Sequence, residues 1–427
     1  MRVLVTGANS FIGSHVAAKL ATAGHEIVGS ARDVREARRR FPHYNWIEAD
    51  FRRHMEWHLD GIDAVVNCVG VLQDGGADST RAAHVEGPRT LFDTCESQNV
   101  RRVIQFSAMG ADPEAGTAYA RTKHEGDRDL MTRALDWTVI RPSLVIARGA
   151  YGGTALIRGL AGLPLITPVM ESTARFHPIH MHDLCRVVEK LLTPDGPVRV
   201  VIEAAGPQVA TLQELISAHR RWLGFGPTRY WLSPEWLTEL AFVLGDGIGA
   251  FGVRTPLRST SRAQMAHDVG GDPKAIPQHL GFTVRPFEQA LNEEPASVQD
   301  RWHARLYFVK PAACVLLASF WIATGLICLT TGRIEAMEMA RRAELGGLDA
   351  VTTIVGGVFD LVIGAAFLIS ARFRRAILLL MATVSVIYVA MLTWTFPELW
   401  ADPLGRLMKL VPFFALLAFI AAVDDER

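Results

Sequence analysis

The chain has 427 residues, of which 44 are basic (Lys+Arg), 44 are acidic (Asp+Glu) and 49% are hydrophobic. The zero net charge argues against a nucleic-acid partner, and the apolar content argues against a disordered chain. A mean hydropathy of +0.18 is high for a soluble enzyme, and the length predicts two or three domains.

The first elements form a predicted strand–helix–strand unit. A strand over residues 2–5 leads into the turn 6–13, a helix over 14–23 and a strand over 26–29. A glycine turn at this place directs free helix N–H groups towards a pyrophosphate, so it predicts a dinucleotide site. Ser10 stands where a middle glycine is expected. The candidate cofactor-binding residues of the turn are Thr6, Gly7, Asn9, Ser10, Phe11, Ile12 and Gly13.

The end of the second strand bears on the choice of cofactor. An NAD site needs a carboxylate here for the ribose 2′-OH, and Asp33 comes one position late. Arg32 can pair with a 2′-phosphate, so NADP(H) is the preferred cofactor and NAD(H) the alternative. The alternative is that Arg32 belongs to a solvated basic helix face with Arg35 and residues 38–40.

Further apolar strands over residues 46–49, 64–69, 102–106 and 137–140 alternate with helical segments. This alternation predicts an α/β fold with a doubly wound parallel Rossmann sheet, which binds ligands at the carboxyl ends of its strands. Asp50 could reach the adenine there or be an ordinary turn residue. The candidate cofactor-binding residues at these strand ends are Asp50, Val69, Gly70 and Pro142.

Three residues are candidates for catalysis. Ser107 ends a strand, and Tyr119 and Lys123 lie four apart at the start of a helix, so the latter two share one face. A lysine ammonium should lower the pKa of a neighbouring phenol, and Lys123 can also hold the nicotinamide ribose. Ser107 would bind the substrate oxygen while Tyr119 transfers the proton. A Tyr-x-x-x-Lys pair alone could also be a surface helix pair.

These motifs, with Arg141-Pro142-Ser143, resemble the extended or atypical branch of the short-chain dehydrogenases/reductases. The chain is similar to the accessory nucleotide-binding subunit of respiratory complex I and its bacterial relatives. The resemblance implies a Rossmann domain over residues 1–300, a small substrate lobe mainly over 149–292, and NAD(P)-linked oxidation or reduction. His84 occupies the position where this family usually has an asparagine. It could act as a proton relay or be a structural residue of its helix. The apolar stretch 231–251 could lie on a bilayer or close the cleft.

Residues 301–427 form the second predicted domain, in which apolar runs are long enough to cross a bilayer. Three runs carry at most one charge each, and a fourth is shorter. Four such runs in succession favour a four-helix transmembrane domain over buried helices of a soluble domain. The expected spans lie at about residues 311–331, 351–371, 376–396 and 405–423.

The distribution of basic residues predicts the topology. Basic residues gather before the first span and between the second and third spans. The positive-inside rule then places the nucleotide domain and both termini in the cytoplasm, on a bacterial-type inner membrane. The N-terminus shows no secretory signal, and five scattered cysteines fit a reducing compartment.

The segments 301–307, 359–361 and 409–412 resemble the DoxX-like four-helix membrane domain. Asp360 is the single charged residue of its span. A carboxyl group inside a membrane is costly, which makes Asp360 a functional candidate, although it could also hold the bundle together by a structural hydrogen bond.

Three functions follow as hypotheses. The first is a membrane-anchored NAD(P)H-dependent oxidoreductase that acts on an apolar carbonyl or quinone-like substrate. The second is a non-catalytic NADP(H)-binding assembly or sensor subunit of a respiratory or lipid-synthesis membrane complex. The third is a nucleotide-sugar epimerase or dehydratase, which suits the fold but is less natural beside a membrane anchor.

Overall fold

The computed structural model describes residues 1–427 except 54, 76–77, 251–254, 266–269, 343–348, 404 and 425–427. The chain divides into two compact units, Met1–Ala304 and Arg305–Arg427, and the predicted boundary after residue 300 lies just before this division. Each unit is described separately below.

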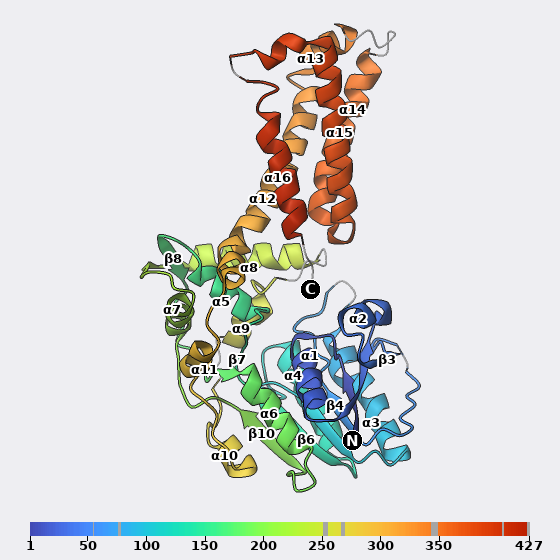
Figure 1. Ribbon diagram of the computed structural model, residues 1–427, viewed down its shortest axis with the longest axis vertical. Helices are drawn as coiled ribbons and strands as arrows, with labels where there is room; N and C mark the ends of the chain where they lie inside the picture. Colours follow the sequence, from blue (N-terminus) through green and yellow to red (C-terminus); the bar gives the residue numbers. More distant parts are fainter. Residues whose placement is uncertain are drawn as a thin grey trace. The chain divides into compact units, whose positions relative to one another are not determined.

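The first unit is built on a seven-stranded, wholly parallel sheet with the order β10-β6-β5-β4-β1-β2-β3 (Figure 1). The strand order reverses between β1 and β4, and this reversal is where parallel sheets of this kind bind ligands. The strands are β1 (Arg2–Thr6), β2 (Glu26–Ala31), β3 (Asn45–Glu48), β4 (Ala64–Asn67), β5 (Arg102–Phe106), β6 (Asp136–Pro142) and β10 (Val200–Ala204). The predicted doubly wound fold is confirmed.

Helices cover both faces of this sheet, because alternate side chains of each strand point to opposite sides. Val3 and Val5 of β1 join a core with the first group of helices, whereas Leu4 joins a second core with the other group. The first group is α1 (Phe11–Thr22), α2 (Val34–Arg40), α6 (Met181–Leu191) and α10 (Ala275–Leu280). The second group is α3 (Gly87–Ser97) and α4 (Ala118–Met131).

A lobe with its own apolar core is built from segments that come before and after β10 in the chain. Two buried arginines stabilise this lobe by hydrogen bonds to backbone carbonyl oxygens. The guanidinium group of Arg158 donates to the Ala147 oxygen, and that of Arg220 donates to the Ala161 oxygen. Arg158 also faces Asp300, near the start of the long helix α12, at 3.5 Å. The lobe contains β7 (Val145–Ile146), α5 (Gly153–Ala161), β8 (Ile166–Val169), β9 (Ile179–His180), α7 (Leu212–Trp222), β11 (Arg229–Leu232), α8 (Glu235–Ala250), α9 (Ser259–Met265) and α11 (Phe287–Glu293).

The second unit is a bundle of apolar helices that run alongside one another (Figure 1). Among the described residues, three helices are long and apolar enough to cross a membrane, and a fourth is shorter. The fourth starts at Leu410 rather than near residue 405, and a short helix, α13 (Arg333–Arg342), lies between the first two. The four apolar helices are α12 (Val298–Leu329), α14 (Asp349–Ile369), α15 (Arg374–Thr395) and α16 (Leu410–Val423).

Glycines allow α12 and α14 to approach closely. A Cβ atom on Gly325 would lie 2.6 Å from the carbonyl oxygen of Gly357, so only hydrogen fits there. At one end of the bundle, the buried carboxylate of Asp424 pairs with Lys310 at 3.4 Å and Arg374 at 3.0 Å. The start of the first span, the loop before the third and the end of the fourth therefore lie at the same end of the bundle.

Candidate active site

The glycine turn between β1 and α1 has the form of a dinucleotide-binding turn. Gly7 has a φ of +64°, which favours glycine, and a Cβ on Gly13 would lie 2.2 Å from the Gly7 carbonyl oxygen. The hydroxyl of Ser10 accepts from the Gly13 N–H at 3.1 Å and caps α1. Ser10 therefore replaces the expected middle glycine because it starts the helix. A cradle this tight fits a pyrophosphate at the helix N-terminus.

A chain of buried polar side chains joins the strand ends beneath this turn. The hydroxyl of Thr6 donates to Asn67, and the amide of Asn67 donates to Gln105 at 2.7 Å. The Val69 N–H also donates to Asn67, at 3.2 Å. The Thr6 side chain is thus committed to the sheet, and Asn67 and Gln105 position the loop that follows β4. Sequence reasoning missed both, because nothing local distinguishes them from other strand residues.

The remaining predicted residues of the turn lie in the loop and in the first turn of α1. Asn9 lies in the loop before the helix cap, and Phe11 and Ile12 begin the helix. Phe11 stacks on Tyr151 with ring centroids 5.6 Å apart. Pro142 ends β6 and pairs with Ala204 of β10, so it lies at the carboxyl edge of the sheet.

Arg32 lies directly after β2, as the sequence predicted, and its guanidinium donates to Asp78 at 3.0 Å. Asp33 caps α2 by accepting from the Glu36 N–H at 2.9 Å. The carboxylate that an NAD site would need is therefore engaged in starting a helix. The cation at the end of β2 remains half exposed, with 47% of its side chain accessible.

Asp50 is held by a second arginine that sequence reasoning missed. The Arg52 Nε donates to Asp50 at 2.7 Å, and this hydrogen bond lowers the pKa of the Asp50 carboxyl. Arg32 lowers the pKa of Asp50 further through its charge, and Asp78 raises that of Arg52. Two arginines and two aspartates thus form one charged cluster near the ends of β2 and β3.

His84 positions the loop that carries Gly70. Its Nε2 accepts from the Val71 N–H at 3.1 Å, and its Nδ1 contacts the Thr122 hydroxyl at 2.8 Å. The Thr122 hydroxyl donates to Ala118, so it accepts from His84. Both ring nitrogens are therefore engaged, and burial lowers the pKa of His84 well below its usual value. The structure supports the structural role of this histidine.

Lys123 is buried between the sheet and the Gly70 loop. Its Nζ donates to the Phe106 carbonyl oxygen at 2.8 Å. A Cβ atom on Gly70 would lie 3.3 Å from the same Lys123 Nζ. Burial lowers the pKa of Lys123 to about 8, although Asp127 opposes this shift. A side chain at position 70 would therefore press against the lysine ammonium.

Tyr119 corrects one expectation from the sequence. Its pKa is raised to about 12, first by burial and then by the charge of Asp127, whereas the sequence predicted that Lys123 would lower it. Lys123 directs its ammonium to the Phe106 carbonyl instead. The phenol therefore holds its proton at neutral pH. Its ring meets that of His84 edge-on, with centroids 5.5 Å apart.

Ser107 has a partner that the sequence analysis did not name. Its hydroxyl donates to Asp127 Oδ2 at 2.6 Å, and the same oxygen accepts from Arg141 at 3.1 Å. Asp127 follows Tyr119 and Lys123 at the same four-residue spacing on α4, which was the available signal. Burial raises the pKa of Asp127, while Ser107, Arg141 and Lys123 oppose the shift.

A cavity of about 250 Å³ opens beside Tyr119. Its other walls come from the loop after β4 and from Thr260 of α9. Arg258 connects the two sides, because its guanidinium donates to Gln73 at 3.1 Å and pairs with Asp246 of α8 at 3.1 Å. The lobe thus covers the side of the sheet where Tyr119 lies.

Helix α8 also carries an unusual number of exposed apolar side chains. Part of the predicted stretch 231–251 lies in β11 and α8, and residue 251 is outside the described residues. The large exposed side chains of α8 are Trp236, Leu240, Val243 and Leu244.

Two protein families match this chain. Residues 7–159 match the NAD(P)H-binding family, and residues 318–418 match the DoxX-like family. The chain thus combines an NAD(P)-binding domain with a C-terminal DoxX-like domain. The apolar helices of this second domain associate it with a membrane.

Curated relatives match the N-terminal half. The mitochondrial NADH-ubiquinone oxidoreductase 40 kDa subunit of Neurospora crassa is 24% identical over 218 residues, which is 49% of this chain and 57% of that protein. An uncharacterised protein of Mycobacterium tuberculosis strain H37Rv is 24% identical over 225 residues, 51% of this chain and 23% of that protein. The chain therefore matches only part of the length of these relatives.

Solved structures share the fold. The structure of gox2253 aligns with a TM-score of 0.52 at 19% identity, over 71% of this chain and 99% of that one. The structure of MoeE5 with UDP-glucuronic acid and NAD has a TM-score of 0.50 at 19% identity, and the match covers 68% of this chain and 96% of MoeE5. The structure of the dTDP-glucose 4,6-dehydratase of Bacillus anthracis with NAD has a TM-score of 0.50 at 16% identity, and the match covers 69% of this chain and 94% of the dehydratase.

Proposed function

We propose that the protein is a membrane-associated, NAD(P)H-dependent oxidoreductase that reduces an apolar carbonyl or quinone-like substrate. The observation that carries this proposal is the protonated phenol of Tyr119 at a cavity lined by the loop after β4 and by α9. Lys123 and Ser107 belong to the same group, since both interact with Asp127. A nicotinamide cofactor supplies the hydride when bound.

The proposed roles follow from the state of each side chain. Tyr119 keeps its proton at neutral pH, so it acts as the general acid that protonates the substrate oxygen. Ser107 binds that oxygen when its hydroxyl turns from Asp127, to which it donates in the structure, towards the substrate. Lys123 holds the nicotinamide ribose. The raised pKa keeps Tyr119 in its protonated form at neutral pH, which is the form that proton donation to a substrate oxygen requires.

We propose that the cofactor is NADP(H), with NAD(H) as the alternative. Asp33 is engaged as a helix cap, while Arg32 and Arg52 place two cations near the ends of β2 and β3. The exposed ion pair between Arg32 and Asp78 contributes only ~0–1 kcal/mol to stability. A 2′-phosphate could therefore take the place of Asp78 as the partner of Arg32. The other cofactor contacts would come from the turn at Gly7–Gly13 and from Asp50, Val69, Gly70 and Pro142.

The apolar substrate and the location of the protein are also proposals. The exposed apolar side chains of α8 support a lobe that meets lipid or lipid-soluble molecules. Lys310 and Arg374 lie at one end of the bundle, and we place this end, with the nucleotide domain and both termini, in the cytoplasm of a bacterial-type inner membrane. The bilayer is the proposed partner.

The test is a Tyr119→Phe variant of the full chain in detergent, assayed for NADPH oxidation with 2-methyl-1,4-naphthoquinone and with long-chain aldehydes. Loss of the general acid should reduce kcat by about 10²–10⁴-fold. Tyr44→Phe is the matched control, because Tyr44 packs against Phe41 and Trp46 away from the cavity. Unchanged turnover in Tyr119→Phe would refute the proposed mechanism.

A second function is favoured by a specific observation. The Ser107 hydroxyl donates its only proton to Asp127, and a relative at 24% identity is a subunit of NADH-ubiquinone oxidoreductase. A non-catalytic NADP(H)-binding assembly or sensor subunit of a respiratory or lipid-synthesis complex would bind NADPH without turnover and tolerate Tyr119→Phe. The likeness to nucleotide-sugar enzymes extends to the fold alone, and product analysis with UDP-glucose tests that third hypothesis.

A further inference from the structure

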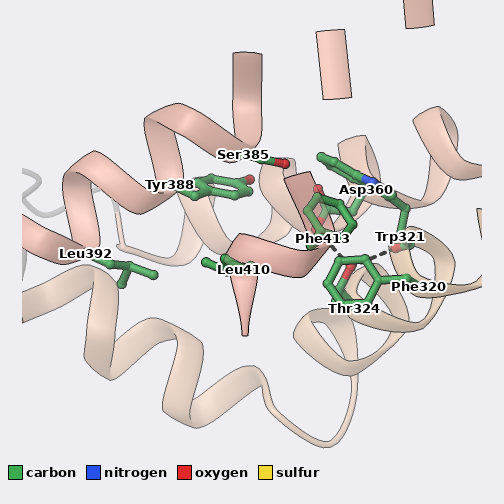
Figure 2. Close-up of a pocket in the computed structure, with 9 residues that line it drawn as sticks. All are labelled: Phe320, Trp321, Thr324, Asp360, Ser385, Tyr388, Leu392, Leu410 and Phe413. Carbon is green, nitrogen blue, oxygen red and sulfur yellow. Dashed lines mark hydrogen bonds between the residues drawn. The ribbon is translucent and has the colours of Figure 1, made fainter. Parts of the chain in front are cut away.

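The C-terminal unit contains a second cavity, to which all four apolar helices contribute (Figure 2). Its volume is about 250 Å³. Asp360 of α14 and Trp321 of α12 are 7% and 3% exposed, and both line it. Asp360 lies near the middle of its 21-residue helix, so the cavity is well inside the apolar part of the bundle.

The carboxyl group of Asp360 fits its surroundings as a neutral acid. Thr324 has one hydroxyl proton, and its oxygen lies 2.9 Å from the Trp321 carbonyl oxygen but 3.3 Å from Asp360 Oδ2 (Figure 2). The Thr324 hydroxyl is the donor in both contacts, and its one proton can serve only one of the two oxygens at a time, so Asp360 does not have a full hydrogen bond that would compensate a charge. None of the lining residues is basic, and an uncompensated charge at this depth is costly.

Two buried polar atoms at this cavity have no hydrogen-bond partner among the described residues. They are Asp360 Oδ1, an acceptor, and Trp321 Nε1, a donor. Buried polar atoms are normally paired, so these two mark unused binding capacity. A hydroxyl group is the simplest neutral function that both donates to a carboxyl oxygen and accepts from an indole N–H.

The remaining walls favour a ring. Phe320 and Phe413 lie with ring centroids 4.9 Å apart and ring planes tilted by 44°, Leu392 continues the apolar lining, and Tyr388 adds a ring that carries a hydroxyl group. Aromatic walls pack against planar rings. The volume is below the ~300–1,000 Å³ of sites for drug-sized ligands, so it suits one ring system rather than a whole lipid.

We propose that the cavity between α12, α14, α15 and α16 binds a membrane-soluble phenol or similar hydroxylated ring, with the hydroxyl at Asp360 and Trp321. A hydrophobic cation does not fit as well, because it cannot accept from the Trp321 N–H. The site lies entirely in the C-terminal unit and does not depend on the proposed hydride transfer.

The test measures binding of 1-naphthol to the full chain in phosphatidylcholine nanodiscs, with partition into empty nanodiscs subtracted. Saturable binding is expected, and naphthalene, which lacks the hydroxyl, should bind about tenfold more weakly. Trp321→Phe and Asp360→Leu should each weaken naphthol binding by about the same factor. Thr383→Val is the control, because the exposed Thr383 donates to Leu379 and does not line the cavity.

Asp360→Asn separates the neutral acid from a carboxylate. The amide is neutral and keeps an acceptor oxygen, so naphthol binding should stay within about threefold of the parent. Preferential binding of 1-naphthylmethylamine that Asp360→Asn abolishes would overturn the proposal in favour of a cation site. Absence of saturable naphthol binding, as for a cavity that holds only water, would also overturn it. If Asp360→Leu fails to fold, Trp321→Phe and Asp360→Asn still decide.

Discussion

Two buried aspartates, one in each unit, meet very different surroundings. Asp127 receives a serine hydroxyl from the end of β5 and a guanidinium from β6, and the ammonium of Lys123 adds to the positive charge around it. Asp360 contacts one threonine hydroxyl at 3.3 Å, and no basic residue lines its cavity. Each carboxyl group keeps one oxygen, Oδ1, without a hydrogen bond among the described residues, so the difference lies in charge: basic neighbours compensate Asp127, whereas none lines the Asp360 cavity. The function of a buried carboxyl group therefore has to be inferred from its neighbours: from the charges that compensate it and from the polar atoms that lack hydrogen-bond partners.

The largest effect should come from Asp127→Leu. Removing this carboxylate leaves Arg141 and Lys123 without their shared buried partner, which should destabilise the first unit by about 3–5 kcal/mol. Asp360→Leu should cost the second unit only about 1 kcal/mol, because it removes a single hydrogen bond of a neutral group. Pulse proteolysis of the full chain in urea measures both changes. Asp195→Leu, at an exposed position after α6, is the control, and equal costs for the two buried aspartates would remove the contrast.

The second prediction concerns the pH dependence of Lys123. Its pKa in the folded chain is about 8 against an ordinary 10.5, so the unfolded chain binds the proton more tightly. Between these pH values the unfolded state carries more protons, and stability therefore rises with pH, by up to about 3 kcal/mol. The difference in stability between the parent and Lys123→Met, measured by the same proteolysis from pH 7 to 10.5, should show this rise. A flat difference would mean that the lysine is better solvated than its burial indicates.

The smallest effect should come from Arg32→Gln. The side chain is half exposed, so its loss should leave stability nearly unchanged while lowering the preference for NADPH over NADH by about tenfold. Dissociation constants of the two cofactors, measured by fluorescence titration, check the ratio. Arg35→Gln, an exposed change on α2, is the control. Equal weakening of both cofactors would assign Arg32 to general electrostatics and not to the 2′-phosphate.

The sequence predicted much of the candidate site, but not how its members interact. Ser107, Tyr119 and Lys123 were named because they occur at a strand end and at one helix spacing, which are local patterns. The direction of the Tyr119 pKa was wrong, because it depends on burial and on Asp127 and not on the nearest lysine in the chain. Asn67, Gln105 and Arg52 were missed, since their contacts join separate strands and loops.

The sequence by itself determined the parallel sheet, the NAD(P)-binding turn and the long apolar helices, because hydrophobic periodicity and charge-free runs are properties of neighbouring residues. Only the tertiary structure decided that Ser10 caps a helix across the glycine turn and that Asp127 binds Ser107 and Arg141. The same holds for the cavity where Asp360 meets Trp321 from another helix. Hydrogen bonding and burial depend on which distant segments meet, and that information lies in the packing of the whole chain.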